Sequence, residues 1–223
     1  MIKLVSWDVD GTLFSYARLF QSLIRLAPRK LHRVGLSALA QEIREVWDFH
    51  AVVESQRRTA DCRVDEAQME GFAEVNANER QALHAALLRI RPRQAAIRLL
   101  DQFKGLHVPQ VALSDFECAY KVKALGVDGY FAGTYSCREI GFWKPSPLVL
   151  ERLQKDFGVQ PGEHMHIGDR PDTDGEACAR NGAYFQLIHA SPKLWRPLRS
   201  LLRFSNDFHD AATPLRKAAL FKL

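Results

Sequence analysis

Residues 4–14 read Leu4-Val5-Ser6-Trp7-Asp8-Val9-Asp10-Gly11-Thr12-Leu13-Phe14. A mostly apolar run that ends in Gly-Thr predicts a buried strand entering a turn. Asp8 and Asp10 leave this strand one residue apart, and two carboxylates that close raise each other's pKa unless a cation or a shared proton compensates. The pair therefore indicates a hard divalent metal held by oxygen ligands, with one carboxylate left for covalent or acid–base chemistry. An Asx turn that merely closes a loop is the structural alternative.

The composition is that of a folded domain. At 223 residues, 47% of them hydrophobic, the chain suits one medium domain or a core domain with a smaller insert. It shows no secretory leader pattern and no apolar stretch of the ~18 residues that a membrane-spanning helix needs. Four scattered cysteines, without metal-type or disulfide-type spacing, fit a reducing compartment. We therefore expect a cytoplasmic protein.

The positive charge is concentrated in the C-terminal tail. From Lys193 to the end, seven basic residues face two acidic ones, which accounts for the whole formal charge of +5. The rest of the chain is near neutral, so no nucleic-acid partner is expected. Residues 194–204 alternate Leu and Trp with arginines, a basic amphipathic pattern that can contact an anionic membrane. We favour instead a helix that packs its apolar face on the core.

The remaining sequence shows two different patterns of hydrophobic residues. Residues 15–90 have apolar side chains at helical spacings and predict an almost wholly helical segment. From residue 92 onward, helical and strand-like patterns alternate, with helices predicted at 92–104, 117–125, 145–157 and 174–181, and strands at 108–113, 130–135, 164–167 and 183–188. Such alternation predicts an α/β fold with a parallel sheet covered on both faces.

Three predicted strand ends carry polar clusters. These are Asp8 with Asp10, Ser114 with Asp115, and Asp169 with Asp174. In open α/β sheets, ligands bind at the carboxyl ends of the strands, so the clusters are expected to meet there. His164 and His166 alternate with apolar residues along a predicted strand and are expected to lie in the core rather than to bind a ligand.

Four motifs, in order over essentially residues 2–188, carry a resemblance to a known family. They are Asp8-Val9-Asp10-Gly11-Thr12, Ser114 after residues 110–113, Lys144-Pro145, and Gly168-Asp169-Arg170-Pro171-Asp172-Thr173-Asp174-Gly175. With them the chain resembles the haloacid dehalogenase (HAD) superfamily, in the phosphoglycolate-phosphatase-like subclass with a helical cap inserted after the first strand.

The resemblance implies a domain organisation. A Rossmann-like, doubly wound parallel sheet would form a core from residues 1–14 and 91–190. Residues 15–90 would form an α-helical cap that opens and closes over the site and sets substrate choice. Residues 191–223 would be a basic helical extension.

The resemblance also implies roles at the first and fourth motifs. Asp8 would be the nucleophile that forms an aspartyl-phosphate, and Asp10 the general acid and then the general base. Mg²⁺ would be held by the carboxylates of Asp8 and Asp169 and the backbone carbonyl of Asp10. Asp174 would complete this metal site by holding a metal-bound water or orienting the ligands.

The remaining positions would bind and stabilise the phosphoryl group. Ser114 would donate a hydrogen bond to it, with Asp115 and Thr12 in the same phosphate-binding site. Lys144 would stabilise both the Asp8 carboxylate and the charge that develops on phosphorus. Without the resemblance, the sequence favours a helix N-cap for Ser114 and a solvated residue before a helix-starting proline for Lys144.

The implied activity is phosphatase chemistry on a small phosphorylated metabolite. Dehalogenases of this family lack the second aspartate of the first motif, because a halide leaving group needs no proton, and here Asp10 is present. Two alternatives stay open: a phosphomutase, which uses the same motifs, and a catalytically idle binding or regulatory protein on the same fold. The protein would be a monomer or a homodimer.

Overall fold

The computed structural model describes residues 1–188. Within them, one sheet contains β1 (Leu4–Trp7), β2 (Gln110–Ser114), β3 (Gly133–Ser136), β4 (His164–Gly168) and β5 (Tyr184–Leu187). All pairings are parallel and the strand order is β3-β2-β1-β4-β5, with β1 in the centre. The predicted α/β fold with a parallel sheet is confirmed. The predicted extension at residues 191–223 lies outside the described residues.

Nine α-helices lie within the described residues. They are α1 (Tyr16–Val34), α2 (Leu36–Arg57), α3 (Glu66–Glu70), α4 (Ala73–Leu87), α5 (Gln94–Gly105), α6 (Ala119–Ala124), α7 (Cys137–Ile140), α8 (Leu148–Phe157) and α9 (Glu176–Asn181). Short 3₁₀ turns occupy Asp128–Tyr130 and Pro161–Glu163, and a π-helical turn occupies Pro171–Gly175. None of the described helices is long and apolar enough to cross a membrane.

Three predicted elements start later than expected because a turn comes first. The strand expected at 130–135 starts at Gly133, because Asp128–Tyr130 forms a 3₁₀ turn first. The helix expected from residue 145 starts at Leu148, after a turn in which the Ser146 N–H donates to the Trp143 carbonyl. Only the last six residues of the helix expected at 174–181 are α-helical, since the π-helical turn precedes them.

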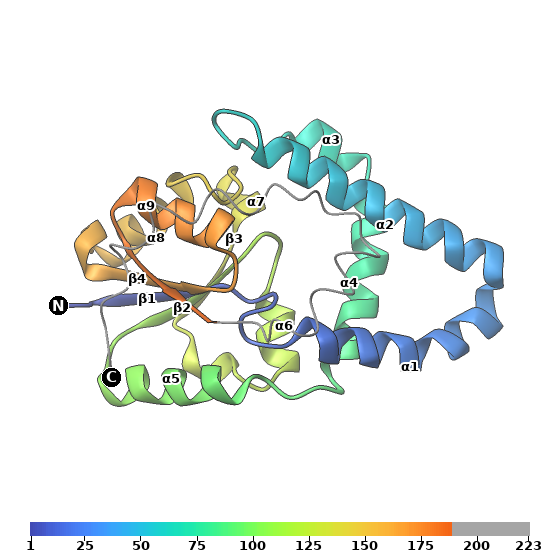
Figure 1. Cartoon of the computed structure of the whole chain (residues 1–223), viewed down its shortest axis with the longest axis horizontal. Helices are drawn as coiled ribbons and strands as arrows, with labels where there is room; N and C mark the ends of the chain where they lie inside the picture. The colour runs from blue at the N-terminus through green and yellow to red at the C-terminus, as the bar shows by residue number, and fades with distance from the viewer. Residues whose placement is uncertain (189–223) are drawn as a thin grey trace.

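The two faces of the sheet are covered by different helices (Figure 1). Helices α5 and α6 cover one face and α8 and α9 the other. Side chains alternate along each strand, so that Val5 and Trp7 of β1 pack with Leu100 of α5, whereas Leu4 packs with Leu150 of α8. Both faces of the sheet are therefore shielded from solvent, as expected for a parallel sheet buried between helices.

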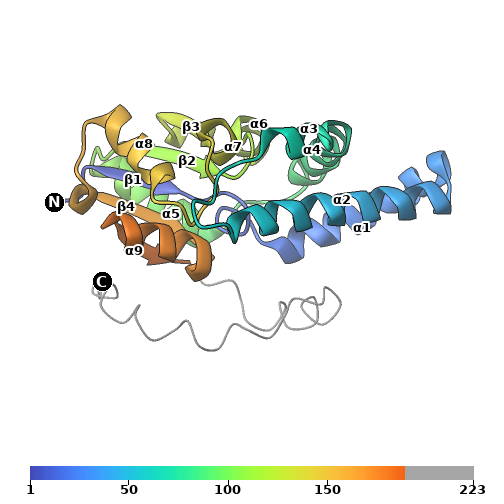
Figure 2. The same cartoon turned by 90° about the horizontal axis from the view of Figure 1, so that it is seen from above.

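Helices α1 to α4 form the segment inserted between β1 and β2, here called the helical insert (residues 16–87). It lies beyond the carboxyl ends of the strands; α1 and α2 meet at their connecting turn and diverge toward the sheet, and α4 packs against both (Figures 1 and 2). The sequence pattern at 15–90 predicted these helices correctly. Their position brings the C-terminal end of α2 to the edge of the sheet where the polar clusters meet.

The buried face of α5 makes a direct test of this packing. Leu100 is fully buried in the core beneath β1, whereas Leu106, at the end of the same helix, is 70% exposed. Leu100→Ala should lower the free energy of unfolding by about 2–5 kcal/mol, because it removes buried methyl groups and leaves a cavity. Leu106→Ala should change it by less than about 0.5 kcal/mol. Urea denaturation followed by circular dichroism measures both, and equal effects would contradict the packing.

Candidate active site

The carboxyl ends of the central strands bring the predicted residues together. Asp8 directly follows β1, Ser114 ends β2 and Asp169 directly follows β4. The Asp8 N–H donates to the Ile167 carbonyl at 2.8 Å, which continues the pairing of β1 with β4 beyond the end of the strand. Because β1 lies between β2 and β4, Ser114 and Asp169 converge on Asp8, although they are 106 and 161 positions away from it in the sequence.

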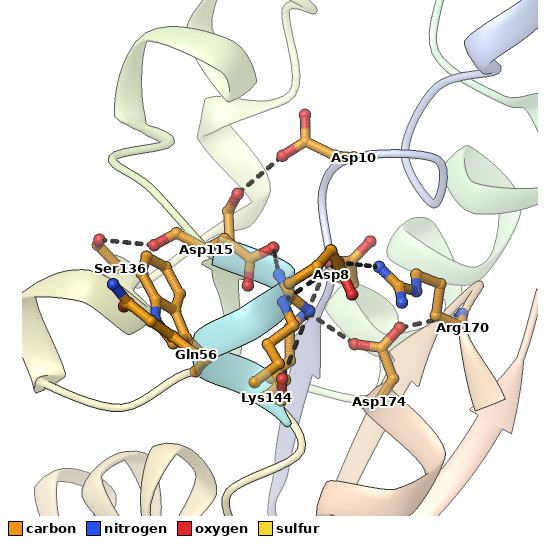
Figure 3. Close-up of polar contacts among 12 residues, drawn as sticks. Asp8, Asp10, Gln56, Asp115, Ser136, Lys144, Arg170 and Asp174 are labelled. Carbon is orange, nitrogen blue, oxygen red and sulfur yellow. Dashed lines mark hydrogen bonds and ion pairs between the residues drawn. The ribbon is translucent and has the colours of Figure 1, made fainter. Parts of the chain in front are cut away.

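Lys144 is the centre of a buried ionic cluster. Its Nζ donates to Asp8 Oδ1 and to Asp174 Oδ1, both at 2.7 Å. Lys144 is 2% exposed, Asp8 7% and Asp174 1%, so these ion pairs are shielded from bulk water. Asp174 is further held by the backbone N–H of Arg170, which donates to Oδ2 at 3.1 Å. Figure 3 shows the three side chains gathered at one point of the site.

The cluster carries excess negative charge. Burial raises the pKa of Asp8 well above its usual value; Lys144 lowers it, but Asp174, Asp169 and Asp10 raise it further. Burial and the neighbouring Asp174 raise the pKa of Asp169 to about 7. Burial opposes ionisation of Asp174 as well, yet Lys144 and a hydrogen bond from His166 outweigh it and lower the pKa of that carboxyl. A further cation would therefore be strongly favoured here.

Two glycines allow the carboxylates to come this close. Gly11 has φ +92°, in the left-handed region that favours glycine, and a Cβ there would collide with the carboxylate of Asp169 and the ring of Tyr16. A Cβ on Gly168 would collide with the side chain of Asp174. The glycines of the first and fourth motifs therefore make room for the acidic groups.

Three carboxylates fit a divalent cation. Asp8, Asp169 and Asp174 each offer an oxygen, and these oxygens lie within 4.8 Å of one another. Asp8 Oδ2 is buried and has no hydrogen-bond partner among the described residues, so it has a lone pair to give. An all-oxygen, anionic donor set of this kind suits Mg²⁺. The carboxylate of Asp10 is not part of the set; its backbone carbonyl oxygen accepts a hydrogen bond from Tyr16 Oη at 3.1 Å.

Asp10 belongs to a second cluster, set apart from Lys144 (Figure 3). Its Oδ2 accepts a hydrogen bond from Ser114 Oγ at 2.8 Å and forms an ion pair with Lys121 of α6. Lys121 Nζ is also 3.4 Å from Ser114 Oγ. Burial opposes the charged form of Lys121, but Asp10 outweighs it and raises the pKa of the lysine.

A chain of buried polar side chains supports Asp174 from beneath. His166 Nε2 lies 3.2 Å from Asp174 Oδ1, and Ser6 Oγ lies 2.7 Å from His166 Nδ1 and 2.8 Å from His164 Nε2. Burial lowers the pKa of His166 and brings that of His164 to about 3, so both rings are neutral. Since an ionised carboxylate only accepts, His166 donates from Nε2 and accepts from Ser6 at Nδ1.

The histidines thus lie in the core, as predicted, yet they reach the site. His164 and His166 are fully buried on the face of the sheet under α8 and α9. Gln154 of α8 continues the chain, with its Nε2 3.2 Å from His164 Nδ1. Every ring nitrogen is therefore paired, and the orientation of Asp174 is fixed by the interior of the protein.

The end of α2 contacts the same edge of the sheet. Arg57 forms an ion pair with Asp115 Oδ2 and donates to the backbone carbonyl of Lys144 at 3.4 Å. Arg170, between the fourth-motif aspartates, donates to Glu54 of α2 at 3.1 Å. The helical insert is therefore docked onto the two loops that hold Lys144 and Asp169.

The predicted site residues form two clusters and two separate positions. Asp8, Lys144, Asp169 and Asp174 meet around the potential cation site, and Asp10 meets Ser114 beside it. Thr12 is fully buried, with a hydroxyl that has no hydrogen-bond partner among the described residues. The carboxylate of Asp115 is engaged by Arg57.

The sequence patterns single out neither Lys121 nor Arg57. No local signal distinguishes Lys121 from Lys123 of the same short helix, although only Lys121 is buried. Arg57 is 58 residues away from Asp115 in sequence, so their pairing follows from tertiary structure alone.

Known proteins resemble the chain in sequence and in structure. A glyceraldehyde 3-phosphate phosphatase of Methanopyrus kandleri is 26% identical over 193 residues, 82% of each chain. A HAD phosphatase from Thermococcus onnurineus has a TM-score of 0.62 at 18% identity, over 90% of this chain and 98% of that one. The L-2-haloacid dehalogenase of Xanthobacter autotrophicus has a TM-score of 0.59 at 19% identity, over 92% of this chain and 84% of that one.

A family model decides the assignment. The model of haloacid dehalogenase-like hydrolases matches residues 2–182, which include all four motifs and every element from β1 to α9. The chain belongs to the haloacid dehalogenase-like hydrolases.

Proposed function

We propose that this hydrolase is a Mg²⁺-dependent phosphatase that cleaves a small phosphate monoester through an aspartyl-phosphate on Asp8. The observation that carries the proposal is the contact of Lys144 with Asp8 inside a set of three carboxylates, two of them buried and one half-buried, with Asp10 and Ser114 beside it. The similarity to a glyceraldehyde 3-phosphate phosphatase supports a small phosphorylated substrate.

Asp8 is the nucleophile of the proposed reaction. One of its oxygens attacks phosphorus while the bond from phosphorus to the ester oxygen breaks. Lys144, held at 2.7 Å from Asp8 Oδ1, keeps the carboxylate oriented and offsets negative charge as the dianion approaches. Asp8, Asp169, Asp174 and the Asp10 carbonyl would hold Mg²⁺, which when bound supplies the charge neutralisation that an anionic nucleophile and a phosphate dianion need.

Asp10 carries the proton. In the first half-reaction its carboxyl protonates the departing ester oxygen, and in the second it accepts a proton from the water that hydrolyses the aspartyl-phosphate. Ser114 and the free hydroxyl of Thr12 are the proposed donors to the phosphoryl oxygens. For Asp115 we propose an indirect part in phosphate binding: its carboxylate holds Arg57 at the edge of the site.

The helical insert, within residues 15–90, acts as the cap of the proposed enzyme. Its contacts with the core, Arg57 with Asp115 and Glu54 with Arg170, support this role because they join α2 to the loops that carry Asp115 and Asp169. A cap that closes in this way excludes water and limits the size of the substrate. The core, residues 1–14 and 91–190, supplies the chemistry.

Replacing the nucleophile gives the first test of the function. Asp8→Asn should reduce kcat for p-nitrophenyl phosphate with Mg²⁺ by at least about 10³-fold, because removing a covalent nucleophile leaves only binding effects. Asp48→Asn, on the exposed surface of α2, is the matched control and should keep wild-type activity. Equal rates for Asp8→Asn and wild type would contradict the assignment of Asp8 as the nucleophile. With a sugar phosphate as the substrate, transfer of the phosphate between two positions of the sugar, without its release, would instead indicate a phosphomutase.

Metal dependence has a predicted pH profile. Chelation by EDTA should abolish turnover and added Mg²⁺ should restore it. The pKa of Asp169 is raised to about 7, so below this pH the carboxyl carries a proton. Mg²⁺ has to displace that proton in order to bind. The apparent affinity for Mg²⁺ should therefore weaken as the pH falls below 7, by about tenfold per pH unit for each ligand proton that has to leave. Calorimetric titration at pH 6, 7 and 8 measures this, and an affinity that rises as pH falls would contradict it.

A further inference from the structure

Helix α6 places a buried lysine against the site. Lys121 is 3% exposed, although it lies on a helix of six residues, and Lys123 of the same helix faces solvent. A lysine is almost never fully buried without a partner of opposite charge. The partner here is Asp10, the proposed proton carrier, rather than Asp8 or the potential metal ligands.

Lys121, Ser114 and Asp10 form a compact triangle. Lys121 Nζ and Ser114 Oγ both donate to Oδ2 of Asp10, and the lysine nitrogen is 3.4 Å from the serine oxygen. Among the described residues, the hydrogen bonds to this carboxylate all fall on Oδ2. The other oxygen, Oδ1, is therefore the one left to carry a proton.

The two donors to Oδ2 are not equivalent once a substrate binds. Ser114 is a proposed donor to the phosphoryl group, so an incoming phosphate competes with Asp10 for its hydroxyl. Lys121 has three N–H donors and a full charge, and it stays beside Oδ2 when Ser114 turns away. A charged contact of this kind holds a carboxylate more firmly than a neutral one.

We propose that Lys121 is a positioning residue for the general acid: it fixes Oδ2 of Asp10, so that Oδ1 presents its proton to the leaving oxygen. This inference rests on the proposed phosphatase function. As the phosphorus–oxygen bond of the ester breaks and Asp8 bonds to phosphorus, the proton on Oδ1 moves to the departing oxygen. In the hydrolytic step, Oδ1 takes a proton back from water.

Two aryl phosphates of similar shape separate this role from a merely structural one. p-Nitrophenyl phosphate releases a stable phenolate that needs little protonation, whereas phenyl phosphate releases a poorer leaving group that depends on the general acid. The quantity to measure is kcat/KM with Mg²⁺, because it reports the steps up to cleavage of the ester bond. Lys121→Met removes the charge at nearly constant volume, and Lys123→Met on the same helix is the matched control.

Lys121→Met should lower kcat/KM for phenyl phosphate by about tenfold or more and that for p-nitrophenyl phosphate by less than about threefold. Asp10→Asn should show the same selectivity more strongly, and Lys123→Met should match wild type on both esters. Thermal denaturation confirms that each variant is folded; if Lys121→Met is not, Lys121→Gln is judged by the same ratio.

Equal losses on both esters, or no loss on either, would overturn the role of Lys121 while the wild-type enzyme remains a phosphatase. A wild-type protein that releases phosphate from neither ester would overturn the proposed function, and this inference with it.

Discussion

The structure of the site depends on one electrostatic constraint, the crowding of acidic groups around a single lysine ammonium. Asp8, Asp169 and Asp174 each lie within reach of one another, and Lys144 bonds directly to two of them. Burial makes each uncompensated charge costly, which is why the pKa values of Asp8 and Asp169 are raised. The glycines at 11 and 168 and the central position of β1 are the structural features that make such crowding sterically feasible.

The surroundings of this cluster differ between its two sides. On the interior side, Ser6, His164 and His166 form a neutral and fully paired chain that orients Asp174 without adding charge. On the side of the helical insert, Arg57 and Arg170 pair with carboxylates across the boundary between insert and core. Neutral, buried contacts therefore orient Asp174 from the interior, whereas ionic contacts join the helical insert to the core.

The sequence allowed the parallel sheet and the convergence of Asp8, Asp10, Ser114 and Asp169 to be predicted, because each follows an apolar strand and parallel strands present their carboxyl ends at one edge. Lys121 could not be predicted in the same way. Lys121 and Lys123 look alike in the sequence, and which of them is buried depends on how α6 packs on the sheet. Pairings such as Arg57 with Asp115 and His166 with Asp174 likewise depend on tertiary structure, because sequence patterns report periodicity and not contacts between distant segments.

Chemical trapping can reveal whether Asp8 becomes phosphorylated during turnover. Rapid acid quenching of the enzyme with substrate and Mg²⁺, followed by borohydride reduction and peptide mass spectrometry, converts an acyl-phosphate into an alcohol at the modified residue. If Asp8 is the nucleophile, Asp8 alone should be reduced, only when substrate is present, and Asp10 and Asp169 should be unchanged. Reduction at another carboxylate, or turnover with no reducible species at Asp8 under conditions in which the intermediate builds up, would contradict this role of Asp8.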